Sequence, residues 1–168
     1  IYDAGGNEAS TSQTNNAVTL NDKTPSIILS VSIPSNNNTI AVTMSEAVYN
    51  TNSGSGSLES SDFSYSISGG TATLSSSTPT SISKNSNVYT LGLSISGTPD
   101  GAETLVVNPV DDGIFDVVGN ESTTSQSNNS AKLNDKVAPG ISTASIDASN
   151  NYIDITLSEG VYSDINSS

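Results

Sequence analysis

The sequence contains no cysteine, histidine or tryptophan in its 168 residues. Without cysteine, no disulfide can brace the fold. Without histidine and cysteine, the Ser-His-Asp and Cys-His arrangements of nucleophilic catalysis cannot form. The adjacent pair Asp111-Asp112 does not replace them, because neighbouring residues on a loop are not two carboxylates that flank a substrate. The sequence therefore does not predict an enzyme.

Positive charge is also scarce, since the chain has 4 lysines, no arginine and 17 acidic residues, for a net charge of −13. Phosphate contacts need a basic face, so nucleic acid is excluded as an expected partner. The surplus of carboxylates attracts cations, and salt or divalent ions reduce the mutual repulsion. Apolar runs are all far shorter than a membrane span, so this segment is not expected to insert into a bilayer.

A long repeat organises what is present. Residues 1–23 read IYDAGGNEASTSQTNNAVTLNDK, and residues 114–136 read IFDVVGNESTTSQSNNSAKLNDK, at an offset of 113. The same offset relates NNNTIAVTMSEAVY at residues 36–49 to SNNYIDITLSEGVY at residues 149–162. A constant offset indicates a tandem array that is cut inside one copy at each end. Residues 1–24 then hold the C-terminal strand of a preceding unit, residues 25–136 a complete unit, and residues 137–168 the first strands of a following unit.

Short alternating segments between turn signals predict an antiparallel β-sandwich, with a single helical turn at Leu58–Asp62. The predicted strands of the complete unit are Ile27–Ile33, Thr39–Met44, Phe63–Ile67, Thr71–Leu74, Val88–Ile95, Glu103–Val110 and Ser122–Leu133. Gly69-Gly70 is interpreted as a hairpin turn. The predicted core is Ile40, Val42, Tyr89, Leu91, Leu93, Leu105, Val107 and Leu133. Outside the unit, a last strand is expected within Asn7–Leu20 and a first hairpin within Ile141–Tyr162.

Three motifs in the unit suggest a family. They are MSEAV at Met44–Val48, the turn Thr98-Pro99-Asp100-Gly101, and an Asp-x-x-Gly-Asn box at Asp116–Asn120 that recurs at Asp3–Asn7. With these motifs the 113-residue unit resembles the bacterial and archaeal immunoglobulin-like repeats of S-layer proteins and large surface adhesins. The resemblance implies an extracellular stalk, lattice or filament module that is often stiffened by calcium.

Two functions are therefore open. The first is a structural repeat of a long secreted or cell-surface protein, whose partners are neighbouring copies in the same chain or copies joined by strand exchange between subunits. The second is a ligand-recognition module, such as a carbohydrate-binding domain or an adhesin head. Sugar binding usually needs an aromatic platform, whereas Tyr65 and Tyr89 fit core positions.

Oxygen-bearing side chains gather after the Glu103–Val110 strand, at Asp111, Asp112, Asp116, Asn120 and Glu121. Calcium takes six to eight oxygens from carboxylates, amides and backbone carbonyls, so this loop is a candidate site. Ordinary turn chemistry, in which Asp and Asn cap their own backbone, is the alternative.

The sandwich topology extends the candidate set. The loop after the second strand, the loop before the last strand and the incoming linker should share one pole, which brings Asp22, Glu46, Asp116 and Asn120 together. At the other pole, Asp100 and Glu103 should lie near Asp135, where they either form an exposed turn or complete a junction site with Glu159. The candidate metal ligands are Asp22, Glu46, Asp111, Asp112, Asp116, Asn120, Asp135 and Glu159, and the expected ion is calcium.

Overall fold

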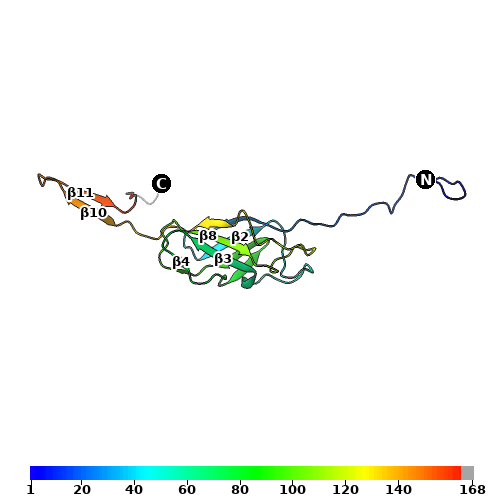
Figure 1. The fold of residues 1–168 in the computed structure, drawn as a ribbon, viewed down its shortest axis with the longest axis horizontal. Helices are drawn as coiled ribbons and strands as arrows, with labels where there is room; N and C mark the ends of the chain where they lie inside the picture. The colour runs from blue at the N-terminus through cyan, green and yellow to red at the C-terminus, as the bar shows by residue number, and fades with distance from the viewer. Residues whose placement is uncertain (164–168) are drawn as a thin grey trace.

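The computed structural model describes residues 1–163 and shows an all-β body with an arm at each end (Figure 1). All members of its main hydrophobic cluster lie between Ile28 and Leu133. The N-terminal arm leaves one end of the body as an extended chain, and the C-terminal arm leaves the other end as a hairpin. The body is thus the part of the chain that has a core of its own.

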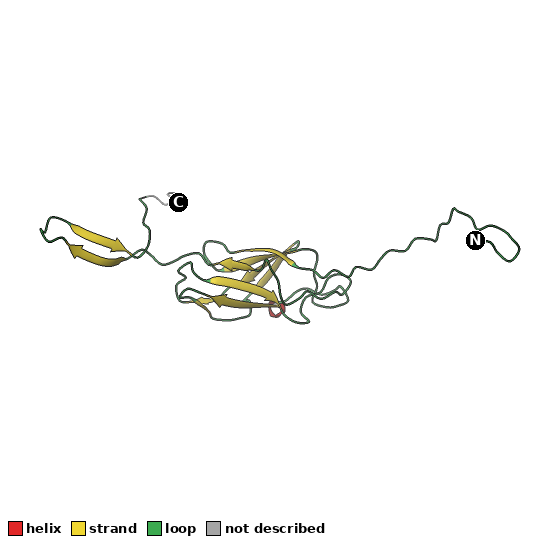
Figure 2. Ribbon diagram, turned by 45° about the horizontal axis from the view of Figure 1, so that its top comes forward, coloured by secondary structure: helices red, strands yellow, loops and turns green. Residues whose placement is uncertain are grey.

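Two principal sheets form the body (Figure 2). The first sheet has the order β1-β2-β6-β5 and consists of β1 (Ile28–Ser32), β2 (Thr39–Met44), β6 (Val88–Gly92) and β5 (Ile82–Asn85). The second sheet has the order β3-β8-β9 and consists of β3 (Phe63–Ser68), β8 (Thr104–Pro109) and β9 (Ser130–Lys132). A small sheet pairs β4 (Thr73–Leu74) with β7 (Ile95–Ser96). All pairings in these sheets are antiparallel, which is consistent with a β-sandwich.

Strict alternation of side chains places the core between the two principal sheets. In both β2 and β8, buried and half-buried residues alternate along the whole strand, as expected when one face of a sheet is covered. The predicted core residues Ile40, Val42, Tyr89, Leu91, Leu105, Val107 and Leu133 are all buried. Leu93 is half-buried and packs against the same cluster.

Several predicted elements differ from the structure because tertiary pairing decides them. Gly69 and Gly70 both have positive φ and turn the chain, but β3 pairs with β8 instead of β4. The predicted strand Val88–Ile95 divides into β6 and β7, which belong to different sheets. Within Ser122–Leu133 only β9 is a strand, and β5 was not predicted from the sequence at all. The predicted turn before β3 is present as a 3₁₀ helix, η1 (Ser60–Asp62).

The N-terminal arm contains no strand in the described chain, contrary to the prediction for Asn7–Leu20. A strand needs a neighbour for its backbone hydrogen bonds, and these residues are exposed along their length.

The C-terminal arm is the predicted hairpin, made of β10 (Ile141–Ile146) and β11 (Ile153–Leu157). Ile141 pairs with Leu157, and the register shifts between Ile141 and Thr143. At the offset of 113, Ile28 pairs with Met44 in β1–β2, and the register shifts between Ile28 and Ser30. The two hairpins therefore have equivalent registers and an equivalent irregularity.

Candidate metal centre

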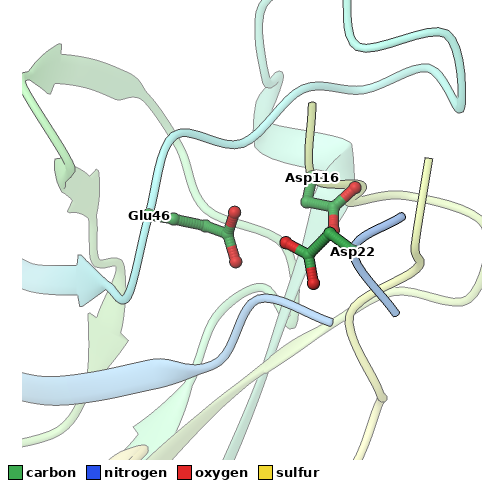
Figure 3. A group of neighbouring side chains, drawn as sticks. All are labelled: Asp22, Glu46 and Asp116. Atoms are coloured by element: carbon green, nitrogen blue, oxygen red, sulfur yellow. The ribbon is translucent and has the colours of Figure 1, made fainter. Parts of the chain in front are cut away.

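Three carboxylates from separate segments meet at the end of the body where the N-terminal arm enters. Asp22 lies before β1, Glu46 follows β2, and Asp116 lies in the loop after β8. One carboxylate oxygen from each residue lies within 4.8 Å of the other two. Figure 3 shows the three carboxyl groups turned toward one another. Asp116 is buried, Glu46 half-buried and Asp22 exposed, so the cluster opens to solvent on the side of the arm.

The Asp-x-x-Gly-Asn box holds Asp116 in place. Its Oδ1 accepts hydrogen bonds from the backbone N–H groups of Val118 (2.8 Å) and Asn120 (2.8 Å). Its Oδ2 accepts one from the Asn120 side-chain amide (2.7 Å). Burial alone would raise the pKa of Asp116, but these hydrogen bonds together hold it below its ordinary value. The carboxylate is therefore ionised and oriented, and Oδ2 keeps one lone pair for a further partner.

Gly119 makes this loop possible. Its φ is +89°, and a Cβ at this position would lie 2.3 Å from the carbonyl oxygen of Asn52. Only glycine allows both the left-handed backbone and this close approach. A tight turn is thus present at Gly119, and it packs the box against the loop that contains Asn52.

Glu46 is electrostatically frustrated in the cluster. Burial raises the pKa of the Glu46 carboxyl, and the negative charges of Asp116 and Asp22 raise it further. The ionised form of Glu46 is consequently less stable in the fold than in water. A cation between the three carboxylates would reverse the sign of this effect.

Asn120 links the box to the incoming chain. Its side-chain amide donates to Asp116 Oδ2 and also to the backbone carbonyl of Asp22 (3.3 Å). The predicted convergence of Asp22, Glu46, Asp116 and Asn120 is thus seen in the geometry. Asn120 serves there as a donor that positions two members of the cluster.

Four other candidates lie apart from the cluster. Asp111 and Asp112 are exposed, and neither belongs to the cluster. The backbone N–H of Asp112 donates to Glu121 Oε1 (2.6 Å), so this part of the loop is bonded to Glu121. Asp135 and Glu159 lie in the C-terminal arm, at the offset of 113 from Asp22 and Glu46. They repeat two positions of the cluster without joining it.

Glu103 differs most from the prediction of either an exposed turn or a junction site with Glu159. It is fully buried. Its carboxylate accepts backbone N–H groups of Thr71 (3.0 Å), Ala72 (2.9 Å), Asp100 (3.1 Å) and Gly101 (3.1 Å). Burial raises its pKa, but the backbone hydrogen bonds outweigh burial and lower the value to about 2. Both oxygens are therefore already occupied.

A signal for Glu103 was present in the sequence. Glycines precede it at two turns, and Gly70 and Gly101 both have positive φ. Such backbone turns direct successive N–H groups into one concave site that suits an anion.

Comparisons with protein-family models, with curated proteins and with solved structures found no match. The structure by itself defines a class, an all-β protein of antiparallel sheets with a three-carboxylate cluster at one end. None of the described residues forms a helix long and apolar enough to cross a membrane.

Proposed function

We propose that this chain is a section of a tandem array of immunoglobulin-like β-sandwich units in a long secreted or cell-surface protein. In this role the unit serves as a spacer of a stalk, S-layer or extracellular filament. The observation that carries the proposal is the equivalence of β10–β11 with β1–β2, which share one register and one irregularity at the offset of 113.

The Asp-x-x-Gly-Asn box supports the same reading at the N-terminal end. In the arm, Asp3 Oδ1 accepts the backbone N–H of Asn7 (2.9 Å), and Oδ2 accepts the Asn7 side-chain amide (2.9 Å). These are the contacts that Asp116 makes with Asn120 inside the body. The box therefore forms the same loop with and without a surrounding sandwich, as a repeated local unit would.

Exposure of apolar residues in the arms supports a neighbour on each side. Ile153 and Ile155 of β11 are 63% and 56% exposed, whereas their counterparts Ile40 and Val42 are fully buried. An exposed two-stranded hairpin with one apolar face is marginal in water. We infer that the remainder of a further unit covers this face, either in the same chain or by strand exchange between subunits.

The alternative of a sugar-binding module has less support. Stacking on a sugar ring needs an exposed aromatic face, but Tyr65 and Tyr89 are buried in the core of the body, and the exposed Tyr2, Tyr152 and Tyr162 lie in the arms. The carboxylate cluster and the two arms lie instead at the ends of the unit, where a neighbouring unit would join it.

We further infer that the cluster of Asp22, Glu46 and Asp116 binds calcium. Three carboxylates satisfy part of the six to eight oxygen ligands that calcium takes, and carbonyls and water would complete the set. Because Asp22 belongs to the entering chain and the other two belong to the sandwich, the ion would fasten the entering chain to the unit. The frustrated carboxyl of Glu46 supports this assignment.

The test is a thermal melt of residues 21–136 with calcium or with chelator at constant ionic strength. Because only the folded state assembles the cluster, calcium at about one hundred times its Kd should stabilise the unit by about 2.7 kcal/mol. Glu46→Gln should remove most of this gain. Asp111→Asn is the matched control, because it removes the same charge from an exposed residue outside the cluster. A melting temperature that does not respond to calcium would refute the metal site.

A further inference from the structure

The chain that leaves the body is held by the unit it leaves. Asn37 Oδ1 accepts the backbone N–H of Asn134 (2.9 Å), and Asn37 Nδ2 donates to the Asn134 carbonyl (2.7 Å). The Asn134 side chain donates to the Pro34 carbonyl (3.0 Å), and the Lys136 N–H donates to the Pro99 carbonyl (2.8 Å). Asn37 is buried and has a φ of +57°. Residues 134–136 are thus fastened to the outgoing end of the sandwich.

The chain that enters the body has the same sequence, since residues 21–23 and 134–136 both read Asn-Asp-Lys. Here the contacts go to the unit that follows. The Asp22 carbonyl accepts the Asn120 side-chain amide (3.3 Å), and the Asp22 carboxylate reaches the cluster with Glu46 and Asp116. A few residues later, Ser26 is buried and hydrogen-bonds to Ser122.

The tripeptide makes the same local hydrogen bond in both settings. Asp22 Oδ1 accepts the backbone N–H of Thr24 (2.9 Å), and Asp135 Oδ1 accepts the N–H of Val137 (2.8 Å), two residues further in each case. The two sets of contacts use different groups. The preceding unit binds the Asn and the N–H of the Lys, whereas the following unit binds the carbonyl and carboxylate of the Asp. One tripeptide can therefore make both sets at the same time.

We propose that the Asn-Asp-Lys tripeptide is a shared anchor, bound simultaneously by the outgoing end of one unit and the incoming end of the next. The anchors overlap, so no free residue is left between consecutive units to act as a hinge. The partner of the outgoing end is thus a second copy of this unit, held in one orientation. This inference rests on the proposed tandem array. The hydrogen bonds between the preceding unit and the tripeptide do not involve the carboxylate cluster, so they should not depend on calcium.

The turn at Asn37 recurs in the next copy. Asn150, at the offset of 113 from Asn37, has a φ of +58°. Left-handed backbone is uncommon for residues other than glycine, so its recurrence at this position gives the following unit the same preformed turn for its own outgoing chain.

The test uses a two-unit chain in which residues 21–136 are followed directly by residues 24–136. Its junction reads Leu-Asn-Asp-Lys-Thr-Pro, as residues 20–25 do. Each unit retains the whole hydrophobic cluster, which lies between Ile28 and Leu133. Residual dipolar couplings measured for each unit in the presence of calcium should fit one common alignment tensor.

Three variants in the first unit examine the anchor. Asn37→Gly removes the side chain but tolerates the positive φ, and Asn134→Ala removes the bond to Pro34. Both should make the alignment tensors of the two units diverge, while each unit keeps dispersed amide signals. Asn38→Ala, at an exposed neighbouring asparagine, should leave the common tensor unchanged.

Independent tensors in the unmodified two-unit chain would overturn the shared anchor. A common tensor that survives both Asn37→Gly and Asn134→Ala would overturn it as well. A melting temperature that does not change with calcium would instead refute the metal site and its proposed role. A common alignment tensor in the unmodified two-unit chain would still support the shared anchor.

Discussion

Glu103 shows at the residue scale how an acidic chain keeps a carboxylate in its interior without a counterion. Several backbone N–H groups converge on it, so the negative charge is satisfied by dipoles that the turns already provide. Asp116 uses the same device within its own loop. Glu46 is the opposite case, because the charged groups that perturb it are carboxylates. This contrast separates carboxylates whose charge is satisfied by backbone N–H groups from one whose charge the fold leaves uncompensated.

Replacing Glu103 tests this distinction. Glu103→Gln puts an amide N–H₂ among backbone donors, which leaves buried groups unpaired. We expect a loss of about 2–4 kcal/mol in the free energy of unfolding at neutral pH, measured by urea denaturation.

The pH dependence of that loss gives a second readout. The pKa of Glu103 is about 2 in the fold against an ordinary 4.5, so the folded state binds fewer protons than the unfolded state between these values. The stabilisation is complete above the unfolded pKa and is lost as the pH falls toward the folded one. The gap between the native protein and Glu103→Gln should therefore narrow on acidification. A gap that is constant with pH would show that Glu103 acts through packing alone.

At the element scale, alternation predicted the strands whose partners lie on both sides, such as β2 and β8. It failed where a strand is short or its inner face is small. β5 reads ISKN and has no buried residue, so nothing in its sequence marks it as a strand. The supposed hairpin at Gly69-Gly70 failed because turn chemistry fixes where the chain reverses, but the neighbouring strand is selected by packing.

The residues of the candidate site were likewise predictable only in part. Asp22, Glu46 and Asp116 could be grouped from the sequence, because a sandwich brings the ends of particular strands to one pole. Asp111 and Asp112 could not be separated from them, because their direction depends on the local turn. Asp112 has a φ of +56°, and its N–H donates to Glu121.

Replacing Gly70 in its turn should destabilise the fold through contact with Glu103. Its φ is +60°, and a Cβ there would lie 2.3 Å from Cδ of Glu103. Gly97, with a φ of +85° and no contact closer than 3.6 Å, is the matched control for backbone strain alone. Gly97→Ala should cost about 1–2 kcal/mol of unfolding free energy. Gly70→Ala should cost about 3 kcal/mol or more, because it also displaces a buried carboxylate. Equal losses in urea denaturation would mean that the backbone turn matters and the contact with Glu103 does not.

For the whole molecule, the chain contains its own comparison between a covered and an uncovered hairpin. β1–β2 and β10–β11 have equivalent registers, but within residues 1–163 only the first has a second sheet over its apolar face. The two hairpins share their local sequence pattern and their internal pairing, so a difference in stability would report what the first hairpin adds, namely the pairing of β2 with β6 and the covering sheet. The array hypothesis can therefore be tested by measuring how much a covering neighbour slows amide hydrogen exchange in the hairpin.

Amide hydrogen exchange of the whole chain measures this difference. Amides in β2 should open only with the body, whereas those in β11 should open with a marginal two-stranded hairpin. Since the free energy of unfolding of a domain is about 5–15 kcal/mol and 1.4 kcal/mol corresponds to tenfold, β2 should exchange at least about a thousandfold more slowly than β11.

In the two-unit chain described above, the second copy of β2 has its own covering sheet, so it should be protected as strongly as the first. Equal protection of β2 and β11 in the original chain would contradict the need for a covering neighbour, unless the protection of β11 rose with protein concentration. Such a rise would show that another copy covers the hairpin, which is the strand-exchange form of the array and not its continuous form.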